Sequence, residues 1–88
     1  METVAEQFEL TPRQRADATI LRDVRAVLAG ILGSEARNLV VLVADGEVTL
    51  AGRVSERWMQ LEIEYEALHV PGVRDVVSRV TAPKTFAK

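Results

Sequence analysis

The 88-residue sequence contains no cysteine and a single histidine, His69. Without cysteine the chain can form no disulfide, no thiolate nucleophile and no cysteine-ligated metal site. One histidine alone cannot build the histidine clusters that bind zinc and related metals. Aromatic residues make up only 5% of the chain, so the position of its one tryptophan, Trp58, is especially informative. We expect neither a cofactor nor a metal in this protein.

The sequence also lacks an excess of charge and any long apolar run. Its 11 Lys and Arg and 13 Asp and Glu residues give a formal net charge of −2. A nucleic-acid-binding domain needs a basic surface to neutralise phosphates, so no nucleic-acid partner is expected. No apolar run approaches the roughly 18 residues of a membrane-spanning helix, and the acidic N-terminus has no signal-peptide-like apolar segment. If this is the full chain, the expected location is the cytoplasm.

Side chains capable of catalysis are not arranged together in the sequence. Glu62, Glu64 and Glu66 fall on different sides of a predicted helix, so they cannot converge as an acid–base pair. His69 lies near the end of that helix, where a contact with the helix dipole or a backbone carbonyl explains it. The five glycines are scattered singly, which excludes a phosphate-binding glycine loop. We predict that the protein is not an enzyme.

The clearest structural signal is the stretch of residues 39–54, in which two Val- and Leu-rich runs flank Asp45-Gly46. An Asp-Gly pair suits the positive φ angles of a two-residue β-hairpin turn. Past the turn, apolar and polar residues alternate, as they do in a strand with one buried face. A glycine on that face permits close approach of another backbone or a helix. The face carries Val48, Leu50, Gly52 and Val54.

The first strand of this hairpin is apolar on both faces. Leu39, Val41 and Val43 should share one face, and the other face should carry Val40, Leu42 and Ala44. A strand of this kind is either central and covered on both sides, or its second face meets a partner.

Apolar spacings of three and four predict a first helix over residues 12–32, ended by Gly33 in a left-handed conformation. The opposite side of this helix carries a basic stripe made of Arg15, Arg22 and Arg25. The stripe is a candidate contact for anionic phospholipid or another anion. The alternative is an ordinary solvated helix face.

A second helix is predicted over residues 56–69, with Ser55 as its N-cap. It carries two apolar stripes, and a helix on one small core can bury only one of them fully. One consists of Trp58, Leu61, Tyr65 and Leu68, and the other of Met59, Ile63, Ala67 and Val70. The tryptophan-containing stripe is either the core itself, a protein interface such as that of a homo-oligomer, or a membrane-inserting surface. The three glutamates near it disfavour insertion among anionic headgroups.

With a last strand at residues 73–81, the order is helix, strand, strand, helix, strand. This order predicts an α+β fold, a two-layer αββαβ sandwich with two helices on one face of a three-stranded mixed sheet. The last two strands should be parallel, and the strand order stays open. The predicted organisation is an N-terminal tail at residues 1–10, one domain at residues 11–82 and a C-terminal tail at residues 83–88.

An ordered set of positions resembles the BON domain, a family named after bacterial osmotically inducible and nodulation proteins. The set covers about residues 16–82 and consists of Asp17-x-x-Ile20-x-x-x-Val24-x-x-x-Leu28, Leu39-x-Val41-x-Val43-x-Asp45-Gly46-x-Val48-Thr49-Leu50-x-Gly52-x-Val54-Ser55, and Ala67-x-x-Val70-Pro71-Gly72-Val73-x-x-Val76. The resemblance implies structural roles for Gly46, Gly52 and Gly72. It also implies that the core side of the second helix carries Ile63, Ala67 and Val70.

The resemblance and the residues together lead to two expectations about function. It implies a non-enzymatic binding module, often periplasmic, that contacts phospholipid membrane surfaces or envelope components, with a role in osmotic or envelope stress. The alternative is a cytoplasmic protein-interaction or homo-oligomerisation domain that uses the stripe of Trp58, Leu61, Tyr65 and Leu68.

Overall fold

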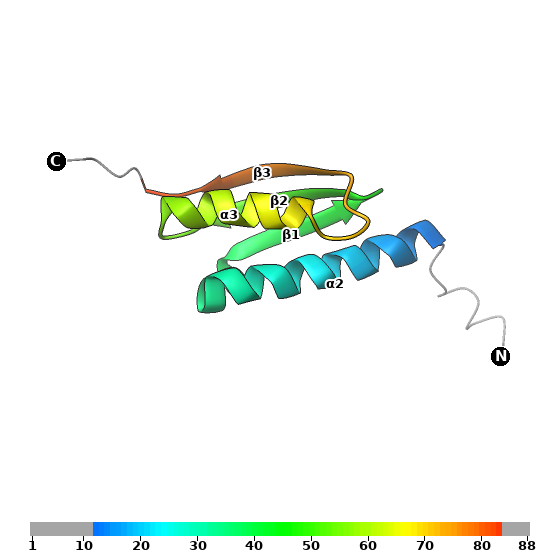
Figure 1. The fold of residues 1–88 in the computed structure, drawn as a ribbon, viewed down its shortest axis with the longest axis horizontal. Coiled ribbons are helices and arrows are strands. Elements are labelled where there is room, and N and C mark those ends of the chain that lie inside the picture. Colours follow the sequence, from blue (N-terminus) through cyan, green and yellow to red (C-terminus); the bar gives the residue numbers. More distant parts are fainter. Residues whose placement is uncertain (1–11, 84–88) are drawn as a thin grey trace.

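The computed structural model describes residues 12–83, which form two α-helices, one short 3-10 helix and three strands. The elements, in chain order, are α2 Pro12–Leu32, η1 Gly33–Asn38, β1 Leu39–Ala44, β2 Glu47–Arg53, α3 Arg57–Leu68 and β3 Asp75–Thr81. Figure 1 shows α3 in front of the sheet and α2 below it in the view, alongside β1. The predicted two-layer α+β sandwich is therefore confirmed. The predicted tails at residues 1–10 and 83–88 lie outside the described residues, except for residue 83.

The sheet has the strand order β1-β2-β3, with β2 in the centre. β1 pairs with β2 antiparallel, from Leu39 opposite Gly52 to Ala44 opposite Glu47. β2 pairs with β3 parallel, which confirms the predicted mixed sheet. Because β1 is an edge strand, its two apolar faces are not explained by a central position in the sheet.

The core lies between the two helices and the inner face of the sheet. α2 packs against β1 and α3, and α3 packs against β3. As the period-two and period-3.6 patterns require, the buried residues recur at alternate strand positions and at helical spacings of three and four. They are Ile20, Val24, Leu28, Leu32, Val41, Val48, Leu50, Val54, Ile63, Ala67, Val70 and Val80.

The two apolar stripes of α3 are separated cleanly by burial. Ile63 and Ala67 are fully buried and Met59 is half-buried. The other stripe is exposed, so the interpretation of that stripe as the core is wrong. Ala67 is small, and its position allows α3 to lie close to α2 and the sheet. A tryptophan and a tyrosine on that side would hold the layers apart.

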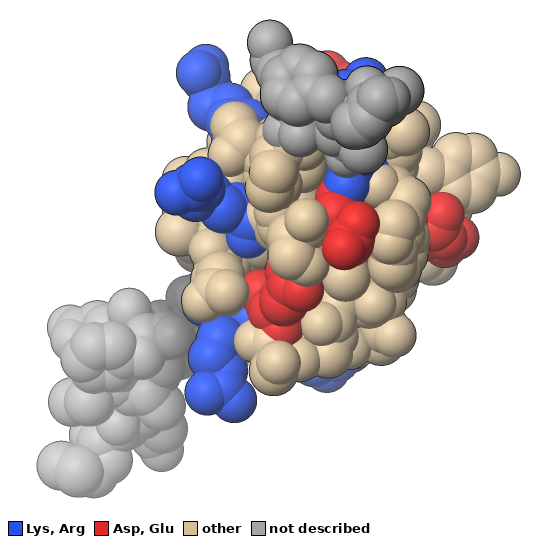
Figure 2. All heavy atoms as spheres, turned by 90° about the vertical axis from the view of Figure 1, so that its left-hand side faces the viewer, with Lys and Arg blue, Asp and Glu red and all other residues tan. Residues whose placement is uncertain are grey.

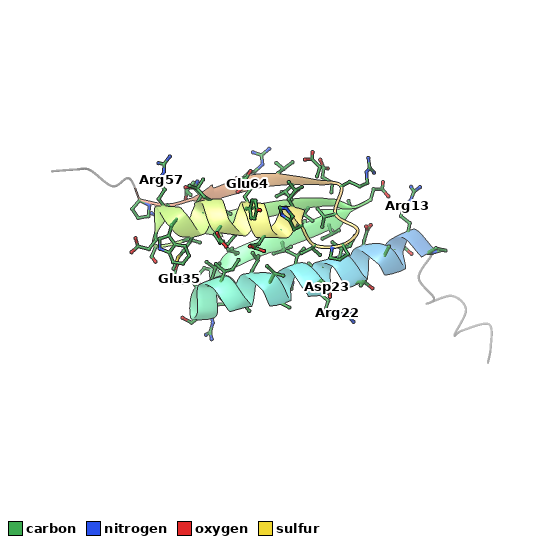
Figure 3. The ribbon with its side chains drawn as sticks, viewed as in Figure 1. Arg13, Arg22, Asp23, Glu35, Arg57 and Glu64 are labelled. Atoms are coloured by element: carbon green, nitrogen blue, oxygen red, sulfur yellow. The ribbon has the colours of Figure 1, made fainter. Side chains whose placement is uncertain are left out.

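The start of α3 differs from the prediction. The helix begins at Arg57, its N-cap position is Glu56, and no side chain caps it. Ser55, predicted as the cap, binds the carboxylate of Glu35 in η1 instead, through its N–H at 2.9 Å and its hydroxyl at 2.6 Å. Figure 3 shows Glu35 near this end of α3. The charged acceptor engages the hydroxyl that would otherwise cap the helix.

Candidate functional site

The turn between β1 and β2 is fastened to α2 by one carboxylate. Asp45 and Gly46 have φ angles of 53° and 81°, as the predicted hairpin turn requires. Asp17 of α2 accepts hydrogen bonds from the N–H of Asp45 at 2.9 Å and from that of Gly46 at 3.0 Å. Sequence reasoning assigned no role to Asp17, because its partners lie 28 and 29 residues further along the chain.

The same turn is held from the other side by Arg74. Its N–H donates to the carbonyl of Gly46 at 2.8 Å, and its guanidinium donates to the carbonyl of Asp45 at 2.9 Å. Arg13, at the start of α2 (Figure 3), forms an exposed ion pair with Asp45 at 3.1 Å. A hollow of about 360 Å³ beside the turn is lined by these side chains and by Asp17. Because these charges pair within the fold, the cluster serves to hold the turn in place.

Of the basic stripe predicted on α2, the structure describes the side chains of Arg22 and Arg25. Arg22 is exposed and its Nε lies 3.4 Å from Asp23, its neighbour in the chain. Arg25 is exposed and lines a different hollow together with Arg37. Arg15 lies within α2, and its side chain is outside the described part of the structure.

The exposed stripe of α3, hereafter the α3 surface, is the largest group of exposed apolar side chains on the helix layer. It consists of Trp58, Leu61, Tyr65 and Leu68, which are 54%, 58%, 60% and 48% exposed. The ring of Tyr65 also contacts that of His69, with the centroids 4.4 Å apart and the ring planes tilted by 43°. The Nδ1 atom of His69 lies 2.7 Å from the carbonyl oxygen of Tyr65, which confirms the predicted carbonyl contact at the helix end.

Charged residues border the α3 surface on both sides. By helical periodicity, Arg57 and Glu64 lie along one side of it and Glu62 along the other. Figure 3 shows Arg57 and Glu64 on α3. In the end-on view of Figure 2, Arg groups are spread over the left, the top and the bottom, and Asp and Glu groups lie in the centre and on the right. With two carboxylates and one guanidinium beside it, the α3 surface has a mainly acidic border.

The outer face of the sheet carries a second group of exposed apolar residues. Val40 is 54% exposed and Leu42 is 60% exposed, both on β1. The register places Leu42 beside Thr49, which in turn lies beside Val77. No helix or strand among residues 12–83 covers this face.

The described residues contain neither a metal site nor a membrane-spanning helix. Within residues 12–83, no group of three or more Asp, Glu or His side chains is placed to hold a metal ion. None of the helices described here is long and apolar enough to cross a membrane.

An αββαβ sandwich whose prominent features are exposed apolar surfaces is typical of a binding domain. The family model of the BON domain matches residues 16–84, so the chain belongs to the BON domain family. The three glycines for which the family resemblance implies structural roles, Gly46, Gly52 and Gly72, all have positive φ in this structure. An alanine Cβ at Gly72 would lie 3.0 Å from the side chain of Ile20 on α2.

Among solved structures, the chain is similar to CdsD, a structural protein of the type III secretion system of Chlamydia trachomatis. The two are 25% identical, the TM-score is 0.54, and the match covers 72% of this chain. The matched region is 32% of the CdsD chain, so the likeness concerns one part of that protein. Comparison with curated proteins found no match.

Proposed function

We propose that this BON domain is a non-enzymatic protein-interaction module that docks a partner on the α3 surface. The observation that carries the proposal is the position of Trp58 and Tyr65, which are more than half exposed on the side of α3 opposite its buried residues. Tryptophan and tyrosine are frequent anchors of protein interfaces, since each contributes a large apolar area with few rotatable bonds. Residues that the core does not need are available for binding.

The charges around the α3 surface define the chemistry of the partner. Glu62 and Glu64 are exposed beside it, so a fitting partner presents an apolar patch bordered by Lys or Arg. The same carboxylates oppose insertion among anionic headgroups. The similarity to a structural protein of a secretion system supports a role in assembly rather than in catalysis.

The first test locates the partner in cells. We expect the photo-reactive amino acid p-benzoylphenylalanine, placed at Leu61, to cross-link one discrete protein, and the same group placed at Ala29 on the exposed side of α2 to cross-link none. The identified protein is then purified and its affinity measured by calorimetry. Loss of an aromatic anchor in Trp58→Glu should weaken binding by at least about thirtyfold.

The matched control is Leu42→Glu, which makes the same kind of change at an equally exposed apolar position on the sheet. It should leave this affinity unchanged, and circular dichroism should show that both variants fold. Absence of a protein adduct at position 61, or equal losses in both variants, would refute docking on the α3 surface.

A second prediction concerns lipid. At low salt the protein should not co-float with vesicles of phosphatidylcholine and phosphatidylglycerol, and the emission of Trp58 should not shift to the blue. The reason is the acidic border of the α3 surface and the ion pair that Arg22 makes with Asp23 at 3.4 Å. Co-flotation with anionic vesicles, weakened by salt and by Arg22→Glu or Arg25→Glu, would instead support the phospholipid contact that the family resemblance implies.

A further inference from the structure

The two edges of the sheet differ in whether their outward-pointing backbone groups are hydrogen-bonded to other parts of the chain. At the β3 edge, side chains bind three of the backbone groups that point away from the sheet. The N–H of Val76 donates to Asp75 at 2.9 Å, and the N–H of Val80 donates to the hydroxyl of Ser78 at 3.4 Å. The carbonyl of Val80 accepts a bond from the amide of Gln60 at 2.7 Å. These bonds occupy part of the backbone that another strand would need.

The β1 edge has no comparable protection. Ala44 and Glu47 flank the two-residue turn and are therefore a hydrogen-bonded pair, and such pairs alternate along an antiparallel ladder. The backbone groups of Val41 and Val43 consequently point outward. Within residues 12–83, no hydrogen-bond partner for these outward groups is found. They form an open template for another strand.

The composition of β1 also favours pairing. Its six residues, LVVLVA, contain no charge and no proline, the features by which edge strands commonly avoid association. All charged residues on the outer face of the sheet lie on the other two strands. They are Glu47, Arg53, Asp75 and Arg79.

We propose that β1 pairs antiparallel with β1 of a second copy of this chain. The strand suits a copy of itself, because two uncharged strands meet without like-charge repulsion and Val and Leu form favourable cross-strand pairs. In the register centred on Val41, Val40 of each copy lies opposite Leu42 of the other, so side chains that are 54% and 60% exposed cover one another. The product is one continuous sheet to which each copy contributes its three strands.

The inner side of the β1 edge has room for such a partner. A hollow of about 180 Å³ there is lined by Arg25, Leu28, Ala36, Arg37, Leu39 and Val41. The inner-face side chains of the second copy that lie opposite Leu39 and Val41, which are Val43 and Val41, would face it. Because the paired strands LVVLVA carry no charge, this dimer should depend little on salt. Docking on the α3 surface, with its acidic border, should instead weaken with salt.

Sedimentation equilibrium and amide exchange test the proposal on the full chain. We expect a monomer–dimer equilibrium, with the amides of Val41 and Val43 exchanging quickly when dilute and becoming protected as concentration rises. Mixed-label NMR should give intermolecular Hα–Hα contacts between Val40 and Leu42. A strict monomer at millimolar concentration, or a dimer in which these two amides stay unprotected, would overturn the proposal.

Variants separate the β1 edge from the α3 surface. Val43→Pro removes an outward N–H on each copy and should weaken the dimer by about tenfold or more. Leu42→Lys adds a charge at the edge without touching the buried residues and serves if the proline variant does not fold. Trp58→Glu should leave the dimer intact. A dimer abolished by Trp58→Glu but kept in Leu42→Lys would place self-association on the α3 surface and refute β1 pairing.

Discussion

Replacing Gly52 with alanine should destabilise the domain by about 3–5 kcal/mol, a large part of the total stability of a small domain. Gly52 has a φ angle of 134°, a backbone conformation that residues with a side chain rarely adopt. An added Cβ would lie 2.5 Å from the carbonyl oxygen of Asn38 and 2.9 Å from a methyl group of Leu39. The conflict involves backbone at the point where the chain enters β1, so a change of rotamer cannot relieve it.

The measurement is the free energy of unfolding from urea denaturation, followed by circular dichroism and by the fluorescence of Trp58. The matched control is Gly30→Ala on α2, where nothing lies within 4 Å of the added Cβ and φ is not in the positive range. That variant should be more stable than the original by about 0.5–1 kcal/mol, because alanine favours the helix. Equal stability of Gly52→Ala and the original would show that Asn38 and Leu39 move aside without cost.

Local pattern was sufficient to predict most of the fold. The Asp45-Gly46 pair fixed the hairpin and its register, and Gly33 ends α2 with a φ angle of 59°, as predicted. The alternation along β1 correctly placed Leu39, Val41 and Val43 on one face, and the structure shows that this is the face towards the core. These features depend on neighbours within a few residues, so the sequence displays them directly. The last strand begins at Asp75, two residues later than predicted.

The rotation of α3 could not be read from the helix itself, because its two stripes are both apolar. The choice depends on how closely α3 approaches the sheet, which is a property of the whole core. Within that core Ile63 and Ala67 are fully buried, and Trp58 lies on the far side. The family resemblance pointed to the same side of the helix through positions matched in related sequences.

Long-range hydrogen bonds were also beyond local reasoning. Ser55 resembles a helix cap by its position, yet Glu35, 20 residues earlier, binds it. The basic stripe on α2 was predicted from angles around a helix, but helical angles do not reveal that Arg22 meets Asp23. Side-chain partners that are distant in sequence, or that depend on rotamers, become visible only in the folded structure.

The two proposed contacts lie on different parts of the molecule and would not compete. The α3 surface belongs to the helix layer, whereas the β1 edge is one edge of the sheet. A dimer formed through β1 would carry two α3 surfaces. Linked copies bind a multivalent partner more tightly than a single copy does, when the geometry allows both to engage. Pairing through β1 would thus strengthen docking on a multivalent partner, and it would leave the affinity of one α3 surface for a single-site partner unchanged.

The position of β1 in this arrangement depends on Asp17, and we expect Asp17→Ala to reduce the free energy of unfolding by about 2–4 kcal/mol. The substitution removes the acceptor of two hydrogen bonds, at 2.9 and 3.0 Å, and leaves the N–H of the buried Gly46 without its partner. Asp17→Asn keeps one acceptor oxygen and should lose an intermediate amount.

Urea denaturation of Asp17→Ala should be compared with Asp23→Ala, which removes a carboxylate from the same helix. Among the described residues, Asp23 pairs with its exposed neighbour Arg22 at 3.4 Å, and an ion pair of this kind contributes about 0–1 kcal/mol. Amide exchange gives a second readout, since the N–H groups of Asp45 and Gly46 should lose protection in Asp17→Ala and keep it in Asp23→Ala. Equal stabilities for the two variants would mean that the turn holds its shape through Arg74 alone, and that α2 does not position the β1–β2 hairpin.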